Sequence, residues 1–242
     1  MAAYERGDHQ AAIAAFELML ADQPFFVDGR TDLARVYLEM GDYEGGWEAL
    51  GNRQTHRSDV IRGALSREQG DLERARFFFE DAEFRAGEDV QALTLQWLKP
   101  DATNALTLGN GLDFGYLQGF SFGEELIETD GSPRSYRWLQ GDGSIVLPLT
   151  RPLEKGSFVR LRMTGTGPTA TPLRITIGGQ NTTIQVRSGE WRVYRVPVPE
   201  ELYGQQQIRM VLARPSLVPV QYNPASTDAR LLSLMISNVA VE

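Results

Sequence analysis

One short motif occurs three times in the first third of the sequence. The dipeptides Gly7-Asp8, Gly41-Asp42 and Gly70-Asp71 are each followed, four residues after the Asp, by a small residue and, four residues later, by a bulky one. The small residues are Ala12, Gly46 and Ala75, and the bulky ones are Phe16, Leu50 and Phe79. Glycine can end a helix in a left-handed conformation, and aspartate can cap the start of the next. The motif therefore predicts pairs of closely packed helices joined by tight turns.

The spacing of this motif resembles that of the tetratricopeptide repeat. Gly7 and Gly41 are 34 residues apart, which is the period of that family, whereas Gly70 follows after only 29 residues. Pro24 and Tyr37 stand where the family places a proline and an aromatic residue. The resemblance covers about residues 1–98 and implies a helical array that makes protein contacts.

In arrays of this kind the first helix of each pair lines an inner groove that binds a peptide or protein partner. The resemblance therefore implies these groove residues: Arg30, Arg35, Tyr37 and Leu38 in the second repeat, and Asp59, Arg62 and Ser66 in the third. The third repeat departs from the second, because Arg62 and Ser66 occupy the positions that Leu33 and Tyr37 hold there.

Composition excludes several classes of chemistry. The 242 residues include no cysteine and two histidines, which rules out disulfides, zinc fingers and thiol nucleophiles. Neither a Gly-x-Ser-x-Gly elbow nor a complete phosphate loop is present. We therefore expect a protein that is not an enzyme and needs no cofactor or metal. No apolar run approaches the ~20 residues that span a bilayer, so we expect a soluble chain of unknown compartment.

Charge is distributed unevenly along the chain. Residues 1–100 contain 19 acidic and 11 basic side chains, whereas residues 101–242 contain 13 of each. The acidic first part argues against a nucleic-acid partner, since phosphate binding needs a cationic surface. Two interpretations of the acidic charge remain open: attraction of a basic partner, or a solvated helical face.

The hydrophobic period changes from 3.6 to 2 near Lys99-Pro100. Residues 159–163 and 173–177 alternate apolar and polar side chains, and Gly-rich turn signals separate such runs. This pattern predicts an α + β multidomain fold, in which a helical array is followed by an antiparallel, jelly-roll-like β-sandwich. We place the helices at 1–98, a linker at 99–111 and the sandwich at 112–242.

The second part also resembles a known type of domain. The segments that carry the resemblance are 112–120, 136–138, 191–197 and 228–232. Their order is similar to that in the β-sandwich appended to bacterial membrane glycosyltransferases, a module related to carbohydrate-binding domains. The resemblance implies a non-catalytic role in holding a glycan, a lipid-linked sugar or a neighbouring domain.

Glycan recognition needs an exposed aromatic face and planar polar groups that satisfy sugar hydroxyls. The candidates are the aromatic residues Tyr136, Trp138, Tyr116 and Tyr222, with Asp228 and Arg230 as polar neighbours. Each has a structural alternative. Trp138 could fill the sandwich core, and Asp228 with Arg230 could form a structural ion pair.

The combined pattern favours a non-catalytic scaffold or accessory protein that binds a protein partner through its repeats and docks through its sandwich. The alternatives are a glycan-binding module and a detached soluble portion of a bacterial membrane glycosyltransferase. Because Met1 falls inside the expected first helix, two interpretations stay open: further repeats, another domain or a membrane segment lies upstream, or the first repeat is simply truncated. An upstream anchor or a partner would associate the protein with a membrane complex or the cell envelope.

Overall fold

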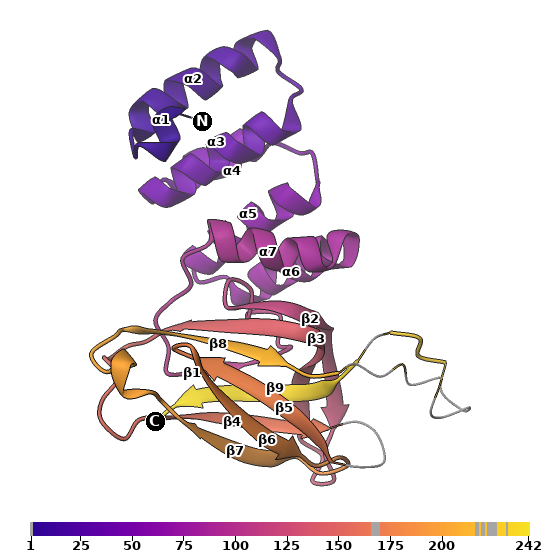
Figure 1. Cartoon of the computed structure of the whole chain (residues 1–242). Coiled ribbons are helices and arrows are strands. Elements are labelled where there is room, and N and C mark those ends of the chain that lie inside the picture. Colours follow the sequence, from indigo (N-terminus) through magenta and orange to yellow (C-terminus); the bar gives the residue numbers. More distant parts are fainter. Residues whose placement is uncertain (1, 166–169, 216–217, 219–220, 222–226, 231) are drawn as a thin grey trace. The chain divides into compact units, whose positions relative to one another are not determined.

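The computed structural model describes residues 2–165, 170–215, 218, 221, 227–230 and 232–242. The chain divides into two compact units, Met1–Leu98 and Lys99–Glu242, here called the helical unit and the β unit. Helices make up the first and antiparallel strands the second (Figure 1). The predicted fold class, helices followed by an antiparallel sandwich, is confirmed.

Seven helices form the described part of the helical unit. They are α1 (Ala2–Glu5), α2 (His9–Asp22), α3 (Val27–Met40), α4 (Tyr43–Leu50), α5 (His56–Glu68), α6 (Leu72–Ala86) and α7 (Glu88–Trp97). Consecutive helices pack against each other, and α3 also packs against α5.

The repeated motif forms the three turns that it predicts. Gly7, Gly41 and Gly70 have φ values of 74°, 76° and 79°, a left-handed backbone conformation that residues with a side chain rarely adopt. The aspartate after each glycine accepts a hydrogen bond from a backbone N–H three residues on; for Asp42 the donor is Gly45, at 3.0 Å. The expected small and bulky residues are buried. A motif of local sequence therefore determines the helix pairs.

Nine strands form the described part of the β unit. They are β1 (Ala105–Thr107), β2 (Leu117–Ile127), β3 (Pro133–Pro148), β4 (Phe158–Gly165), β5 (Thr171–Ile177), β6 (Gln180–Val186), β7 (Arg192–Pro197), β8 (Gln207–Ala213) and β9 (Leu234–Val241), with a short 3-10 helix at Glu200–Leu202. Their order is β6-β5-β8-β3-β9-β4-β7, with β2 paired to β3 and β1 to β9.

Strand β3 belongs to both layers of the sandwich. Its residues 137–139 pair with β9, and its residues 142–148 pair with β8. The sheet therefore turns a corner along β3, and Figure 1 shows the two layers facing each other. Gly119 on β2 permits this bend, because a Cβ at this residue would lie 2.4 Å from the carbonyl oxygen of Asp142.

The core lies between these layers and explains the alternation in the sequence. Val159, Leu161 and Met163 on β4 are fully buried, while Arg160 and Arg162 between them point away from the core. Burial of such side chains contributes about 1.5–3 kcal/mol each. The alternating runs predicted from the sequence are confirmed as strands.

The predicted linker at 99–111 differs from the structure. Residues 105–107 of this segment form β1, which pairs with residues 238–240 of β9. Leu106 and Leu108 are buried in the sandwich. A three-residue strand is too short to show clear alternation, so composition alone suggested a connection here.

A buried ion pair fastens the start of the β unit to β3. Arg137 donates from Nε to Asp113 Oδ2 at 2.6 Å and from Nη2 to Asp113 Oδ1 at 2.9 Å, and both side chains are almost completely buried. Arg137 also donates to the carbonyl oxygen of Ser121, and the backbone N–H of Gly109 donates to Asp113. The segment before β2, strand β2 and strand β3 are thus held together at one place.

Replacing Asp42 with alanine should lower the free energy of unfolding of the helical unit by about 1 kcal/mol, because an N-cap acceptor is lost. Urea unfolding followed by circular dichroism at 222 nm measures the change. Asp22→Ala is the matched control, since this exposed aspartate ends α2 and opposes the helix dipole. Equal losses in the two variants would contradict the capping role.

Replacing Arg137 with methionine should lower the free energy of unfolding by about 3–5 kcal/mol, because the buried Asp113 carboxylate loses its counter-charge. Guanidinium unfolding followed by tryptophan fluorescence tests this. The control is Arg209→Met, which removes an exposed arginine of β8 and should change stability by less than about 0.5 kcal/mol. Similar unfolding midpoints for the two variants would show that the ion pair is not needed.

Candidate functional site

The structure brings together four of the six predicted glycan-binding residues. Tyr136 and Trp138 are in edge-to-face contact, with ring centroids 6.1 Å apart. The Tyr136 hydroxyl donates to Glu124 Oε2 at 3.0 Å, and Arg230 donates to Glu124 Oε1 at 2.6 Å. Arg230 also forms an ion pair with Asp228 at 2.7 Å. These residues form one connected cluster.

Local charge alters the pKa values in this cluster. Burial, together with the adjacent Glu124 carboxylate, raises the pKa of Tyr136 to about 12. The hydrogen bonds from Arg230 lower the pKa of the Asp228 carboxyl. Asp228 and Arg230 therefore form an ion pair, as one of the two interpretations expected, and Arg230 also binds Glu124, the acceptor of the Tyr136 hydroxyl.

The other two predicted glycan residues do not join this cluster. Tyr116 is 7% exposed, belongs to the sandwich core and donates its hydroxyl proton to the carbonyl oxygen of Asp101 at 2.9 Å. This prediction is wrong, because the tyrosine is inaccessible. Tyr222 lies outside the described residues.

Trp191 extends the aromatic cluster. It is half-buried, directly precedes β7, and lies with its ring centroid 6.0 Å from that of Tyr136. The Arg134 guanidinium stacks over it at 5.1 Å. Tyr136 itself is 8% exposed, so the accessible aromatic surface belongs to the half-buried Trp138 and Trp191.

These aromatic residues point away from the sandwich core. Tyr136 and Trp138 alternate along β3 with Arg137 and Leu139, which point inward. We call the surface they share with the neighbouring strands the outer face. It consists of Arg134, Tyr136 and Trp138 on β3, Arg160 and Arg162 on β4, Trp191 with Val193 and Arg195 of β7, and Asn238 on β9.

A pocket of about 350 Å³ lies on the outer face beside the aromatic cluster. It is lined by Thr107, Pro133, Arg134, Ser135, Arg160, Arg162, Val193, Ser237 and Asn238. This lining contains three arginines and no acidic side chain. The pocket therefore offers hydrogen-bond donors in planar groups together with hydroxyl and amide groups.

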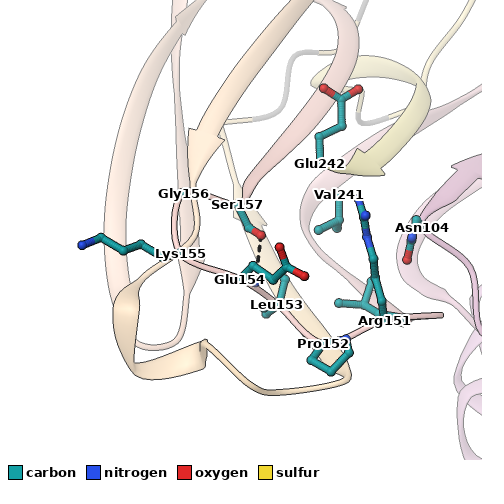
Figure 2. Close-up of a pocket in the computed structure, with 11 residues that line it drawn as sticks. Asn104, Arg151, Pro152, Leu153, Glu154, Lys155, Gly156, Ser157, Val241 and Glu242 are labelled. Carbon is teal, nitrogen blue, oxygen red and sulfur yellow. Dashed lines mark hydrogen bonds between the residues drawn. The ribbon is translucent and has the colours of Figure 1, made fainter.

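A second pocket, of about 150 Å³, lies where β9 ends and the β3–β4 loop passes (Figure 2). Its charged side chains are of both signs, namely Arg151, Lys155, Glu154 and Glu242, and Figure 2 shows Lys155 pointing away from it. It has no aromatic residue in its lining. It suits a sugar ring less well than the outer face does.

The predicted groove of the helical unit is mostly buried. Arg35, Asp59, Arg62 and Ser66 are at most 7% exposed, whereas Arg30, Tyr37 and Leu38 are half-buried. Arg30 is engaged with the backbone, since it donates to the carbonyl oxygens of Pro24 and Ala49. Four of the seven residues therefore are not on an accessible surface, which corrects the prediction.

Trp97 at the end of α7 explains the burial of Arg35. The Arg35 guanidinium lies between two rings, 5.0 Å from the centroid of Trp97 and 4.5 Å from that of Tyr4. Arg57 on α5 stacks on Trp97 as well, at 4.9 Å. Contacts within the helical unit therefore engage Arg35, which the prediction assigned to partner binding.

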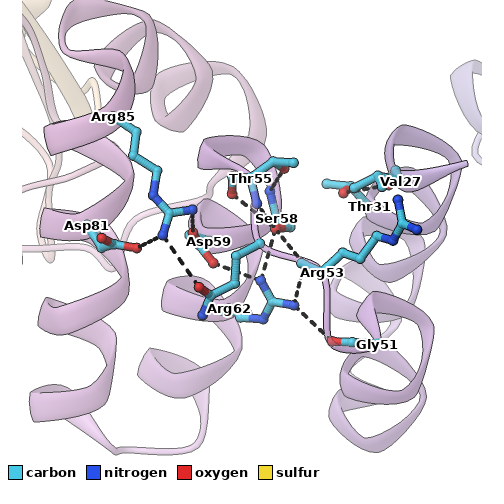
Figure 3. A network of polar contacts seen from close by, with 11 residues as sticks. Val27, Thr31, Gly51, Arg53, Thr55, Ser58, Asp59, Arg62, Asp81 and Arg85 are labelled. Carbon is cyan, nitrogen blue, oxygen red and sulfur yellow. Dashed lines mark hydrogen bonds and ion pairs between the residues drawn. The ribbon is translucent and has the colours of Figure 1, made fainter. Parts of the chain in front are cut away.

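Asp59 and Arg62 serve the α4–α5 connection (Figure 3). Arg62 donates to Asp59 at 2.7 Å and to the carbonyl oxygens of Gly51 and Arg53 at 2.9 and 2.8 Å. Arg85 reaches the second oxygen of Asp59 at 3.1 Å. Burial raises the pKa of Asp59, against the opposing effect of Arg62. This network satisfies the carbonyl groups left open where α4 ends early.

The described residues contain no group of three or more His, Asp or Glu side chains arranged to hold a metal ion. Within the same residues, no helix has the length and apolar character needed to cross a bilayer.

Sequence reasoning missed Arg134, Arg160, Arg162, Asn238 and Trp191 as members of a site. The alternation of β4 does place Arg160 and Arg162 on one side of a strand. The alternation does not show which strands neighbour β4 in the sheet. In the structure β4 pairs with β9, and β9 in turn pairs with β3.

Several solved structures of carbohydrate-binding modules are similar to part of this chain. A β-1,3-glucan-binding family 6 module from Bacillus halodurans has 12% identity and a TM-score of 0.38, covering 59% of this chain and 99% of the module. A family 35 module from Cellvibrio japonicus has 15% identity and a TM-score of 0.35, covering 57% and 92%. A family 6 module from Clostridium cellulolyticum, solved with xylose, has 9% identity and a TM-score of 0.36, covering 58% and 97%.

No protein-family model and no curated protein matches the sequence. The TM-scores of the similar structures are below 0.5, so these matches identify neither a ligand nor a site in this chain.

Proposed function

We propose that the β unit is a non-catalytic glycan-binding module and that it binds through the outer face. The observation that carries this proposal is the position of two half-buried tryptophans, Trp138 and Trp191, around Tyr136 and beside a 350 Å³ pocket lined mostly by polar side chains. Aromatic faces pack against the C–H faces of sugar rings, and planar polar groups bind their hydroxyls.

The rigidity of the cluster supports this function. Tyr136 is held by Glu124, Glu124 is held by Arg230, and Arg134 stacks on Trp191. Side chains already fixed before binding lose little conformational entropy when a ligand arrives. A preorganised aromatic surface of this kind suits a polysaccharide better than a flexible peptide.

The scaffold function that the sequence favoured has less support. Four of its seven proposed groove residues are buried, and one of these, Arg35, is stacked on Trp97 of the helical unit itself. A tetratricopeptide-like array that binds a protein partner at another surface stays a prediction, as does association with a membrane complex.

Replacing Trp191 with alanine should weaken glycan binding at least tenfold, because loss of a central aromatic contact costs roughly 2 kcal/mol or more. Affinity electrophoresis of the full chain through gels containing neutral or acidic polysaccharides would first find a ligand and then measure the variant. Trp47→Ala is the matched control, since Trp47 is also half-buried but lies on α4 of the helical unit.

Two results would contradict the proposal. One is the absence of retardation by every polysaccharide in the panel. The other is unchanged retardation of Trp191→Ala while circular dichroism shows an intact sandwich.

A further inference from the structure

We propose that the outer face selects polysaccharides whose sugar units carry a negative charge, either a carboxylate or a sulfate. This inference rests on the proposed glycan-binding function and adds the class of ligand. It is carried by the charge of the pocket, by the free hydrogen-bonding groups of one arginine, and by the distance between charge and aromatic surface.

The pocket concentrates positive side chains. Its lining includes Arg134, Arg160 and Arg162 and no aspartate or glutamate, while residues 101–242 as a whole contain 13 acidic and 13 basic side chains. Arg160 and Arg162 are two residues apart on β4, so both point outward at a separation of roughly 7 Å along the strand. Two guanidinium groups therefore border one pocket.

Not all of this positive charge is neutralised by the protein. Arg134 forms an ion pair with Glu128, and Arg160 forms one with Glu242. Arg162 is exposed and has no carboxylate partner among the described residues. The guanidinium of an unpaired arginine offers two parallel N–H donors that fit a carboxylate or sulfate.

Arg195, like Arg162, adds to the positive potential of the outer face. Arg195 on β7 lies directly opposite Arg160 in the strand register and is exposed. It stacks on the Phe158 ring at 4.6 Å and likewise has no carboxylate partner in the described part of the chain. Because Arg160 is already paired with Glu242, the charge of Arg195 adds to that of Arg162 in attracting an anionic ligand.

The charge lies close to the aromatic surface. Val193 is the strand partner of Arg162, and Trp191 is two residues before Val193 on the same side of β7. One sugar unit could therefore stack on Trp191 while the next places its anionic group at Arg162. Asn238, opposite Arg162 on β9, uses its side-chain N–H₂ to reach the Leu106 carbonyl, which leaves its oxygen as an acceptor for a hydroxyl.

A nucleic acid fits this surface less well. Its dense phosphate charge favours an extended cationic surface, whereas residues 101–242 contain 13 acidic and 13 basic side chains and the arginines of the outer face form only a local cluster. A polysaccharide with one charge per sugar, and with neutral C–H faces between charges, matches both features.

The test compares pairs of polysaccharides that differ in charge alone. Polygalacturonate is set against its fully methyl-esterified form, and dextran sulfate against dextran, using calorimetry with the full chain. We expect the charged member of at least one pair to bind about tenfold more tightly, with an affinity that falls as salt rises. A difference in affinity within the polygalacturonate pair indicates recognition of a carboxylate, and a difference within the dextran pair indicates recognition of a sulfate.

Variants locate the effect. Arg162→Gln should weaken binding of the charged polysaccharide about tenfold and weaken binding of a neutral ligand by a much smaller factor, because glutamine keeps a planar donor and loses only the charge. Arg174→Gln, an exposed arginine on β5 in the other layer, is the matched control and should change neither.

The possible failures are distinguishable. If neutral polysaccharides bind through Trp191 and charge adds nothing, the inference is overturned while the proposed function stands. If no polysaccharide binds, both fail. If single-stranded DNA binds as tightly as the charged polysaccharide and Arg162→Gln weakens both equally, the face is a general polyanion site and the inference is overturned.

Discussion

The β unit depends on the ion pair between Asp113 and Arg137. Both charges are excluded from water, so each would be costly without the other. Arg137 lies between Tyr136 and Trp138 in the sequence and points into the sandwich, where it also binds a carbonyl of β2. Because neighbouring residues of a strand point to opposite sides, anchoring Arg137 inward holds the two aromatic residues outward.

Core side chains and pocket-lining side chains lie on opposite sides of the same strands. On β4, Val159, Leu161 and Met163 fill the core, while Arg160 and Arg162 border the pocket. The two sets of side chains share a backbone and point to opposite sides of it. Under the proposed function, substitutions on the outer face should change ligand preference with little effect on the core.

The helical unit shows how a repeat tolerates an irregular length. Its third turn follows the second by 29 residues, because α4 is only eight residues long. The shortened helix leaves carbonyl groups at Gly51 and Arg53, and Arg62 replaces an apolar repeat residue to bind them. A residue that departs from the repeat pattern thus compensates for a departure in repeat length, so its burial reflects folding and not partner binding.

The sequence by itself determined the helix pairs and the strands of the core, because both follow from interactions between near neighbours. Gly41 and Asp42 specify a turn through their own backbone and side-chain preferences, and residues 159–163 show the period of a half-buried strand. It also suggested part of the aromatic cluster, since Tyr136 and Trp138 share one face of a single strand. The tertiary structure alone decided that Trp191, Arg134 and Arg162 meet there, and that Trp97 covers Arg35. These contacts join elements that are far apart in the chain. Strand order and helix packing decide which elements become neighbours, and a local sequence period encodes neither of them.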